Sequence, residues 1–231
     1  MQFIDQVVSW KSCTLEQLTG ENLPSSWEEF FLSNWRLLQS ISEKLSKKSE
    51  LILPNLHHVF RPFYDTPLTQ LKVVIIGQDP YPQPGNAIGL CFAVPRGRSI
   101  PKSLGMIHTE LLREGYRASS GDLSPWCRRG VMMINTSLTV AAGQSNSHAE
   151  LWREFTHLFF NFLDNHWKQG IFIMWGREAQ KCKTHLSKRH HFLEANHPAS
   201  RTGGFLDNGH FRRCNEILKA RGEGEIDWNL V

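Results

Sequence analysis

The stretch Val73-Val74-Ile75-Ile76-Gly77-Gln78-Asp79-Pro80-Tyr81 decides the fold class of this 231-residue chain. Its first four residues are all β-branched, which is typical of a strand buried on both faces, and the Gly and Asp-Pro that follow end the strand in a turn. We interpret the runs 131–134, 171–174 and 191–195 as buried strands of the same kind, separated by helical patterns or long connections. The chain is therefore expected to have an α/β fold with a central, mostly parallel four-stranded sheet flanked by helices.

Two segments have the residue spacing of amphipathic helices. Apolar residues recur at three- and four-residue steps from Phe30 to Leu45 and again from Leu151 to Leu163. The segments 26–29 and 147–150 both read Ser-x-x-Glu, the pattern of a capping box, so we expect them to start these two helices.

The composition is that of an ordinary soluble protein, with 40% hydrophobic and 21% charged residues. No apolar run approaches the roughly 18 residues that a membrane span needs, so we expect no membrane association. No internal repeat and no flexible linker divides the chain, so residues 1–231 are predicted to form one domain.

The cysteines point to a reducing compartment. None of the five forms a C-x-x-C pair, which argues against a disulfide framework, a zinc ribbon or an iron–sulfur cluster: Cys13, Cys91, Cys127, Cys182 and Cys214. The segment 1–10 lacks the basic start and apolar core of a signal peptide. We expect an intracellular protein, cytoplasmic in a bacterium or nuclear in a eukaryote or its virus.

Positive charge is concentrated towards the end of the chain. The net charge is only +4, yet residues 177–221 contain ten Lys or Arg against four Asp or Glu. Such a segment favours a polyanionic partner, with nucleic acid the first candidate. A solvated basic surface without a partner is the alternative reading.

Polar side chains follow each of the four predicted strands. Asp79 comes after the first strand, Asn135 ends the second, Arg177 follows the third and His197 follows the fourth. Ligands of parallel α/β sheets bind at the carboxyl ends of the strands, so these four groups are expected to meet there. Each residue alone is more often structural, as a turn, a cap or a loop residue, and it is the joint placement that predicts a site.

The chemistry of this edge matches a flat polar ligand. An amide such as that of Asn135 offers a donor beside an acceptor, as a nucleobase edge does, and Phe92 can stack on a base. A carboxylate and a histidine at the same place can act as acid, base or electrostatic groups.

The opening stretch closely resembles the water-activating motif of family 1 uracil-DNA glycosylases. Further segments match that family in the same order over most of the chain: 89–94, 100–104, 130–140, 142–144 with 147–149, 175–176 with 179–181, 197–198, and 226–228. Several independent motifs in order are far more specific than any one of them.

The resemblance implies a monomeric enzyme, without a metal or other cofactor, that flips uracil out of single- or double-stranded DNA and hydrolyses its N-glycosidic bond. This reaction leaves an abasic site and begins base excision repair. By position, Asp79 is the carboxylate that orients or activates water and stabilises the cationic sugar, and His197 is the histidine that hydrogen-bonds uracil O2.

The resemblance also implies a uracil pocket and a DNA-binding surface. Asn135 would read the O4/N3 edge of uracil, Phe92 would stack on its ring, Gln78 would line the pocket, and Tyr81 would occupy the space that a thymine methyl group needs. The residues assigned to DNA binding are Pro101, Ser103, Gly176, Arg177, Ala199, Ser200 and Arg201. An acidic protein inhibitor that mimics DNA could exploit the same basic surface.

This chain departs from the family pattern at four positions. Pro82 replaces a histidine, Ala199 and Arg177 stand where serines are common, and Arg201 stands where the family has a leucine that wedges into the duplex. We hypothesise that the two arginines replace lost hydroxyl contacts, which makes DNA binding more dependent on salt.

The residues alone leave two other functions open. The first is a non-catalytic DNA-binding or scaffold protein on the same fold, which Pro82 and the altered segment 199–202 favour. The second is a metallohydrolase that uses His57 with His58, or His190 with His191, although adjacent histidines on a strand point to opposite faces.

Overall fold

The computed structural model describes residue 15 and residues 23–231 of the chain. The segment 1–10 and Cys13, on which part of the compartment prediction depends, lie outside these residues. The four other cysteines are buried and free: Cys91, Cys127, Cys182 and Cys214.

The centre of the molecule is a four-stranded parallel sheet, as predicted. Its strands are β2 (Val73–Gly77), β3 (Val131–Asn135), β5 (Ile171–Trp175) and β6 (His191–Ala195), in the order β3-β2-β5-β6. A separate antiparallel pair joins β1 (Ile52–Leu53) to β4 (Val140–Ala141). Because all four central strands are parallel, their carboxyl ends meet at one edge of the sheet.

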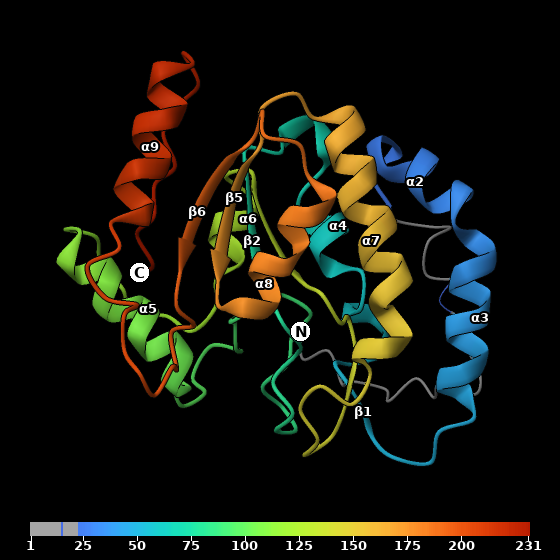
Figure 1. The fold of residues 1–231 in the computed structure, drawn as a ribbon. Helices are drawn as coiled ribbons and strands as arrows, with labels where there is room; N and C mark the ends of the chain where they lie inside the picture. Colours follow the sequence, from blue (N-terminus) through green and yellow to red (C-terminus); the bar gives the residue numbers. More distant parts are fainter. Residues whose placement is uncertain (1–14, 16–22) are drawn as a thin grey trace, which may run out of the picture.

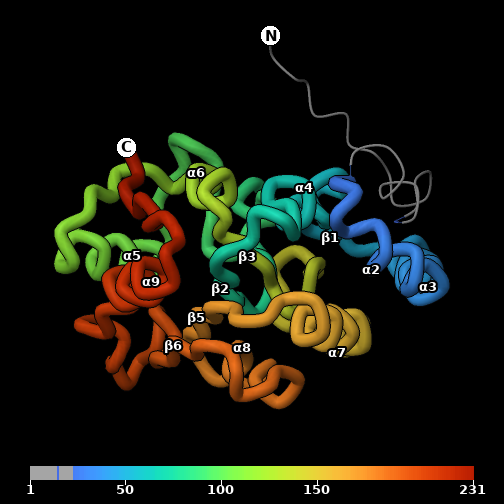
Figure 2. Tube along the Cα trace, turned by 90° about the horizontal axis from the view of Figure 1, so that it is seen from above, coloured from blue at the N-terminus to red at the C-terminus, as the bar shows by residue number. Residues whose placement is uncertain are grey.

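Helices cover both faces of this sheet (Figures 1 and 2). One side carries α2 (Glu28–Ser33), α3 (Trp35–Ser46), α4 (Arg61–Asp65), α7 (Ala149–His166) and α8 (Arg177–Lys181). The other side carries α5 (Lys102–Arg113), α6 (Ser124–Cys127) and α9 (His210–Ala220). Short 3-10 helices occupy Ser25–Trp27, Leu56–His58, Leu68–Gln70 and Cys182–His185.

The alternation of side chains along β2 divides the core into two layers. Val74 and Ile76 belong to the cluster under α7, whereas Val73 and Ile75 belong to the cluster under α5 and α9. All four side chains are fully buried, and burial of each contributes roughly 1.5–3 kcal/mol. The unbroken apolar run in the sequence therefore reflects a strand with a helical layer on each side.

Three predictions about single elements were wrong. The segment 28–45 is two helices, because the backbone at Asn34 leaves the helical region with φ −118° and ψ 12°. The hydroxyl of Ser26 accepts a hydrogen bond from Leu68 N rather than capping α2. Likewise, Ser147 Oγ accepts from Ala141 N, and His148 occupies the N-cap position of α7.

The strand β6 is present but is not buried throughout. It is the last strand of the sheet, and His191 and Glu194 are exposed while Leu193 is buried. The edge position alone does not explain the exposure, because β3, at the other edge of the sheet, is buried at all five positions. No helix among the described residues has the length and apolarity to cross a membrane.

Candidate active site

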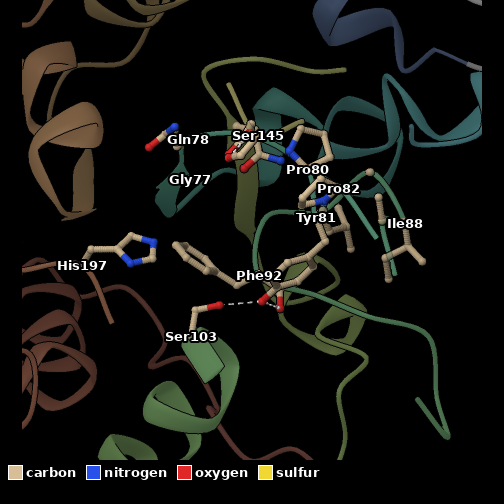
Figure 3. A pocket seen from close by; sticks show the side chains of 15 residues that line it. Gly77, Gln78, Pro80, Tyr81, Pro82, Ile88, Phe92, Ser103, Ser145 and His197 are labelled. Atoms are coloured by element: carbon tan, nitrogen blue, oxygen red, sulfur yellow. Dashed lines mark hydrogen bonds between the residues drawn. The ribbon is translucent and has the colours of Figure 1, made fainter. Parts of the chain in front are cut away.

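A cavity of about 200 Å³ opens at the carboxyl edge of the sheet. Seven of the residues predicted for function line it: Gln78, Asp79, Tyr81, Phe92, Ser103, Asn135 and His197. They come from the ends of β2 and β3, the start of α5, and the loops after β2 and β6. Figure 3 shows the His197 and Phe92 rings side by side at this cavity, with Ser103 below them and Tyr81 on the other side of Phe92 from His197.

The register of β2 and β3 places the amide of Asn135 in this cavity. Gly77 is paired with Asn135, and the chain after β3 stays attached to β2 because Thr136 N donates to Gly77 O at 3.0 Å. A Cβ atom on Gly77 would overlap the side-chain oxygen of Asn135. A glycine is therefore needed at this point for the amide to fold over the end of β2.

Phe92 is held in a backbone conformation that side chains rarely adopt, with φ +62°. Its ring centroid lies 5.7 Å from that of Trp175 and 6.0 Å from that of His197. Such strain persists only where the surroundings enforce it, and it is common at functional sites. Here it turns the ring toward the cavity.

Tyr81 is fixed against Phe92 by its hydroxyl group. Tyr81 OH donates to Phe92 O at 3.1 Å and forms a 2.8 Å hydrogen bond with Ser103 Oγ, drawn as a dashed line in Figure 3. Burial raises the pKa of Tyr81 to about 12, so the phenol stays protonated and neutral at physiological pH.

One oxygen of Asp79 is hydrogen-bonded by a turn that the sequence analysis did not single out. Asp79 Oδ2 accepts from Ser145 Oγ at 2.7 Å and from Asn146 N at 2.6 Å. The only sequence signal was a polar turn, 144–147, inside the region that resembles the family. Pro82 also contacts this turn, since its carbonyl oxygen accepts from Gly143 N at 2.8 Å.

The geometry around His197 fixes its tautomer. Ala199 N donates to His197 Nδ1 at 3.1 Å, so the proton of the neutral ring is on Nε2. Burial lowers the pKa of His197, although the nearby Asp79 charge acts in the opposite direction. A Cβ atom on Gly176, whose φ is +97°, would lie 2.9 Å from the Cβ of His197, so this glycine allows the histidine loop to approach β5.

A second cavity, of about 440 Å³, adjoins the first and shares Gln78 and His197 with it. Gly176, Arg177 and Ser200, three of the residues assigned to DNA binding, line this cavity. The three other residues predicted to bind DNA line neither cavity: Pro101 is the N-cap residue of α5, Ala199 is half-buried beside His197, and Arg201 is exposed.

The paired histidines do not form a metal centre. His57 and His58 lie in a 3-10 helix rather than a strand. His190 is already engaged, because its Nδ1 accepts from Gly170 N at 2.8 Å and its Nε2 contacts Asp164 at 2.9 Å. Among residue 15 and residues 23–231, no three His, Cys, Asp or Glu side chains are grouped so that they could hold a metal ion.

Comparisons with known proteins match the chain to one family. Residues 63–219 match the family model of the Uracil DNA glycosylase superfamily. The uracil-DNA glycosylase of Wolinella succinogenes is 37% identical over 227 residues, covering 96% of this chain and 94% of that protein. The Escherichia coli enzyme of the same name is 41% identical over 211 residues, covering 88% and 90%.

Solved structures agree as well. The crystal structure of mimivirus uracil-DNA glycosylase superposes with a TM-score of 0.86 at 28% identity, covering 100% of this chain and 94% of that chain. Another mimivirus structure, of a Y322L variant in complex with UGI, gives a TM-score of 0.84 at 28% identity and covers 96% and 92%. With the family match over residues 63–219 and relatives this similar along most of its length, the chain belongs to the uracil-DNA glycosylase family.

Proposed function

We propose that Asp79 and His197 carry the reaction of this uracil-DNA glycosylase, which hydrolyses the N-glycosidic bond between uracil and deoxyribose in DNA and leaves an abasic site. The observation that supports this assignment is the single cavity that Asp79, His197, Asn135 and Phe92 share. A carboxylate and a neutral imidazole donor there face the same base-sized space as an amide and an aromatic ring.

The two residues stabilise opposite charges as the bond breaks. Cleavage of the C1′–N1 bond leaves positive charge on the sugar and transfers the bonding electrons to uracil. The Asp79 carboxylate stabilises the sugar and orients the water that adds to C1′. His197 Nε2–H, the free ring nitrogen of the neutral tautomer, donates to uracil O2 as negative charge develops there.

Base selection depends on Asn135 and Tyr81. The Asn135 amide, 6% exposed at the end of β3, presents its donor and acceptor to the O4/N3 edge of uracil. The Tyr81 ring, held by Phe92 O and Ser103 Oγ, fills the space beside uracil C5 and excludes the thymine methyl group.

DNA phosphates bind along the adjoining cavity. Arg177 and Ser200 line it, and the exposed Arg201 lies next in the chain. Arginine binds phosphate in a bidentate manner, which supports these residues as the backbone contacts that help to hold an extruded nucleotide. Both single- and double-stranded DNA are proposed substrates.

Three further properties are part of the proposal. The same basic edge can receive an acidic protein inhibitor that mimics DNA, as relatives solved with UGI illustrate. The protein acts as a monomer, and it works inside the cell that holds its DNA substrate.

The proposed function is tested with the wild-type protein and a single-stranded oligonucleotide that contains one uracil, in the presence of a chelator. Free uracil should be released, whereas the matched thymine oligonucleotide should release no base. Retention of the oligonucleotide without base release would instead favour the non-catalytic DNA-binding alternative.

A further inference from the structure

We infer that Ser145 is a positioning residue for the catalytic carboxylate, because its hydroxyl group holds Asp79 in the orientation that the reaction needs. The inference rests on the proposed role of Asp79. It assigns a function to a turn outside the strand-end motifs. This turn supplies a polar side chain near Asp79, which Pro82 cannot do.

Ser145 and Asn146 occupy one oxygen of the carboxylate and leave the other. Asp79 Oδ2 accepts from Ser145 Oγ at 2.7 Å and from Asn146 N at 2.6 Å. Within the part of the chain that the structure describes, Asp79 Oδ1 receives no hydrogen bond. Two donors on one oxygen fix the side-chain torsion of a carboxylate, so Oδ1 keeps its lone pairs for water or the sugar.

The turn that carries Ser145 is itself held at several points. Asn146 has φ +66°, and its Oδ1 accepts from Gln78 Nε2 at 3.3 Å. On either side, Gly143 N donates to Pro82 O at 2.8 Å and Ser147 Oγ accepts from Ala141 N at 2.9 Å. The Ser145 hydroxyl is therefore presented to Asp79 by a preformed turn rather than by a free loop.

Neutral donors suit this task better than charged ones. Neither the Ser145 hydroxyl nor the Asn146 amide carries a charge, so both orient the carboxylate without neutralising it. Pro82 has no side-chain donor or acceptor, and no polar side chain from that position is available to align Asp79 or water. The turn that carries Ser145, which is joined to Pro82 O through Gly143 N, supplies this alignment.

The test compares Ser145→Ala, Ser145→Thr and Ser147→Ala in the full chain. Ser147→Ala is the control for loosening of the turn, because it removes the hydroxyl that accepts from Ala141 N and leaves the groups that donate to Asp79 in place. We expect Ser145→Ala to lower kcat about tenfold while KM changes less than about twofold. Ser145→Thr, which keeps a hydroxyl, should restore most of kcat, and Ser147→Ala should lower kcat clearly less than Ser145→Ala does.

A second measurement does not depend on activity. The carboxyl ¹³C resonance of Asp79 should move in Ser145→Ala, because a hydrogen bond to Oδ2 is lost, and should stay in place in Ser147→Ala. An unchanged kcat and an unchanged resonance in Ser145→Ala would overturn the inference, as would an equal loss of kcat in Ser147→Ala. If the wild type releases no uracil, the proposed function fails, and the resonance alone then decides whether Ser145 holds Asp79.

Discussion

The hydroxyl of Tyr81 donates a hydrogen bond to the carbonyl oxygen of Phe92 at 3.1 Å. This contact joins the residue assigned to exclude thymine to the residue assigned to stack on uracil. Ser103 Oγ, at the start of α5, forms a 2.8 Å hydrogen bond with the same hydroxyl. The ring assigned to stacking, the ring assigned to steric selection and the first turn of α5 are thus one connected unit.

Removing the Tyr81 ring should allow thymine into the pocket. Tyr81→Ala opens the space beside the C5 position of the base, so we expect measurable thymine release from a thymine oligonucleotide. Tyr81→Phe is the matched control, because it loses only the hydroxyl contacts and keeps the ring. It should remain specific for uracil, and thymine release by both variants would show that the hydroxyl rather than the ring sets the selectivity.

Gly77→Ala should displace the Asn135 amide, because the added Cβ would overlap its side-chain oxygen. We expect uracil release to fall at least about tenfold, since the hydrogen bonds to the base edge lose their alignment. Gly105→Ala is the control, because a Cβ there meets only Ile100 Cγ2 at 3.9 Å. Steady-state kinetics on both variants checks this, and full activity of Gly77→Ala would refute the placement of Asn135.

The salt dependence of DNA binding should report on the two unusual arginines. Arg177→Ser and Arg201→Leu should each reduce the slope of log affinity against log salt by about 1, because each removes one phosphate contact. Arg36→Ser, on the exposed side of α3, should leave the slope unchanged. Unaltered slopes in both site variants would mean that neither arginine binds phosphate.

Stability should decrease in acid partly because of His210. This buried histidine accepts a hydrogen bond from Trp175 Nε1 at its Nδ1, 3.0 Å away. Burial lowers the pKa of His210 to about 4 from 6.5. As pH falls below about 6.5, His210 therefore binds a proton in the unfolded chain before it does so in the folded protein. The contribution of neutral His210 to the free energy of unfolding is complete above that pH and is lost progressively down to about pH 4.

The size of this effect follows from the pKa difference. Between about pH 7 and about pH 5 the free energy of unfolding should fall by about 2 kcal/mol because of this one group. His210→Asn, whose side-chain oxygen can still accept from Trp175, should show a shallower loss in urea unfolding at these two pH values. An equal loss in both proteins would mean that other groups cause the acid sensitivity. His190 is one such group, because burial lowers its pKa as well.

The sheet and the positions of its site residues could be predicted because their signals are local. Val73 to Ile76 are apolar on both faces of the strand, and Asp79 follows directly in the turn. Parallel pairing then brings Asn135 and His197 to the same edge without further information. The resemblance to a family supplied the roles of these residues, which spacing alone does not give.

The missed features depend on contacts between distant residues. Ser26 and Ser147 have the local pattern of helix caps. Their hydroxyl oxygens instead accept hydrogen bonds from Leu68 N and Ala141 N. The contact of Ser145 with Asp79 joins residues 66 positions apart. Nothing in the local sequence around either residue indicates it, because the position of the turn depends on where β4 and α7, which flank it, lie in the fold.

The most direct test of the account is the single-turnover rate of uracil release by Asp79→Asn, beside oligonucleotide affinity and Tm. Asparagine keeps the size of the side chain but removes its charge, so the cationic sugar loses its stabilising partner. We predict that the rate falls at least about 1000-fold while affinity and Tm remain close to those of wild type. A rate within about tenfold of wild type would contradict the assignment of Asp79 as the catalytic carboxylate.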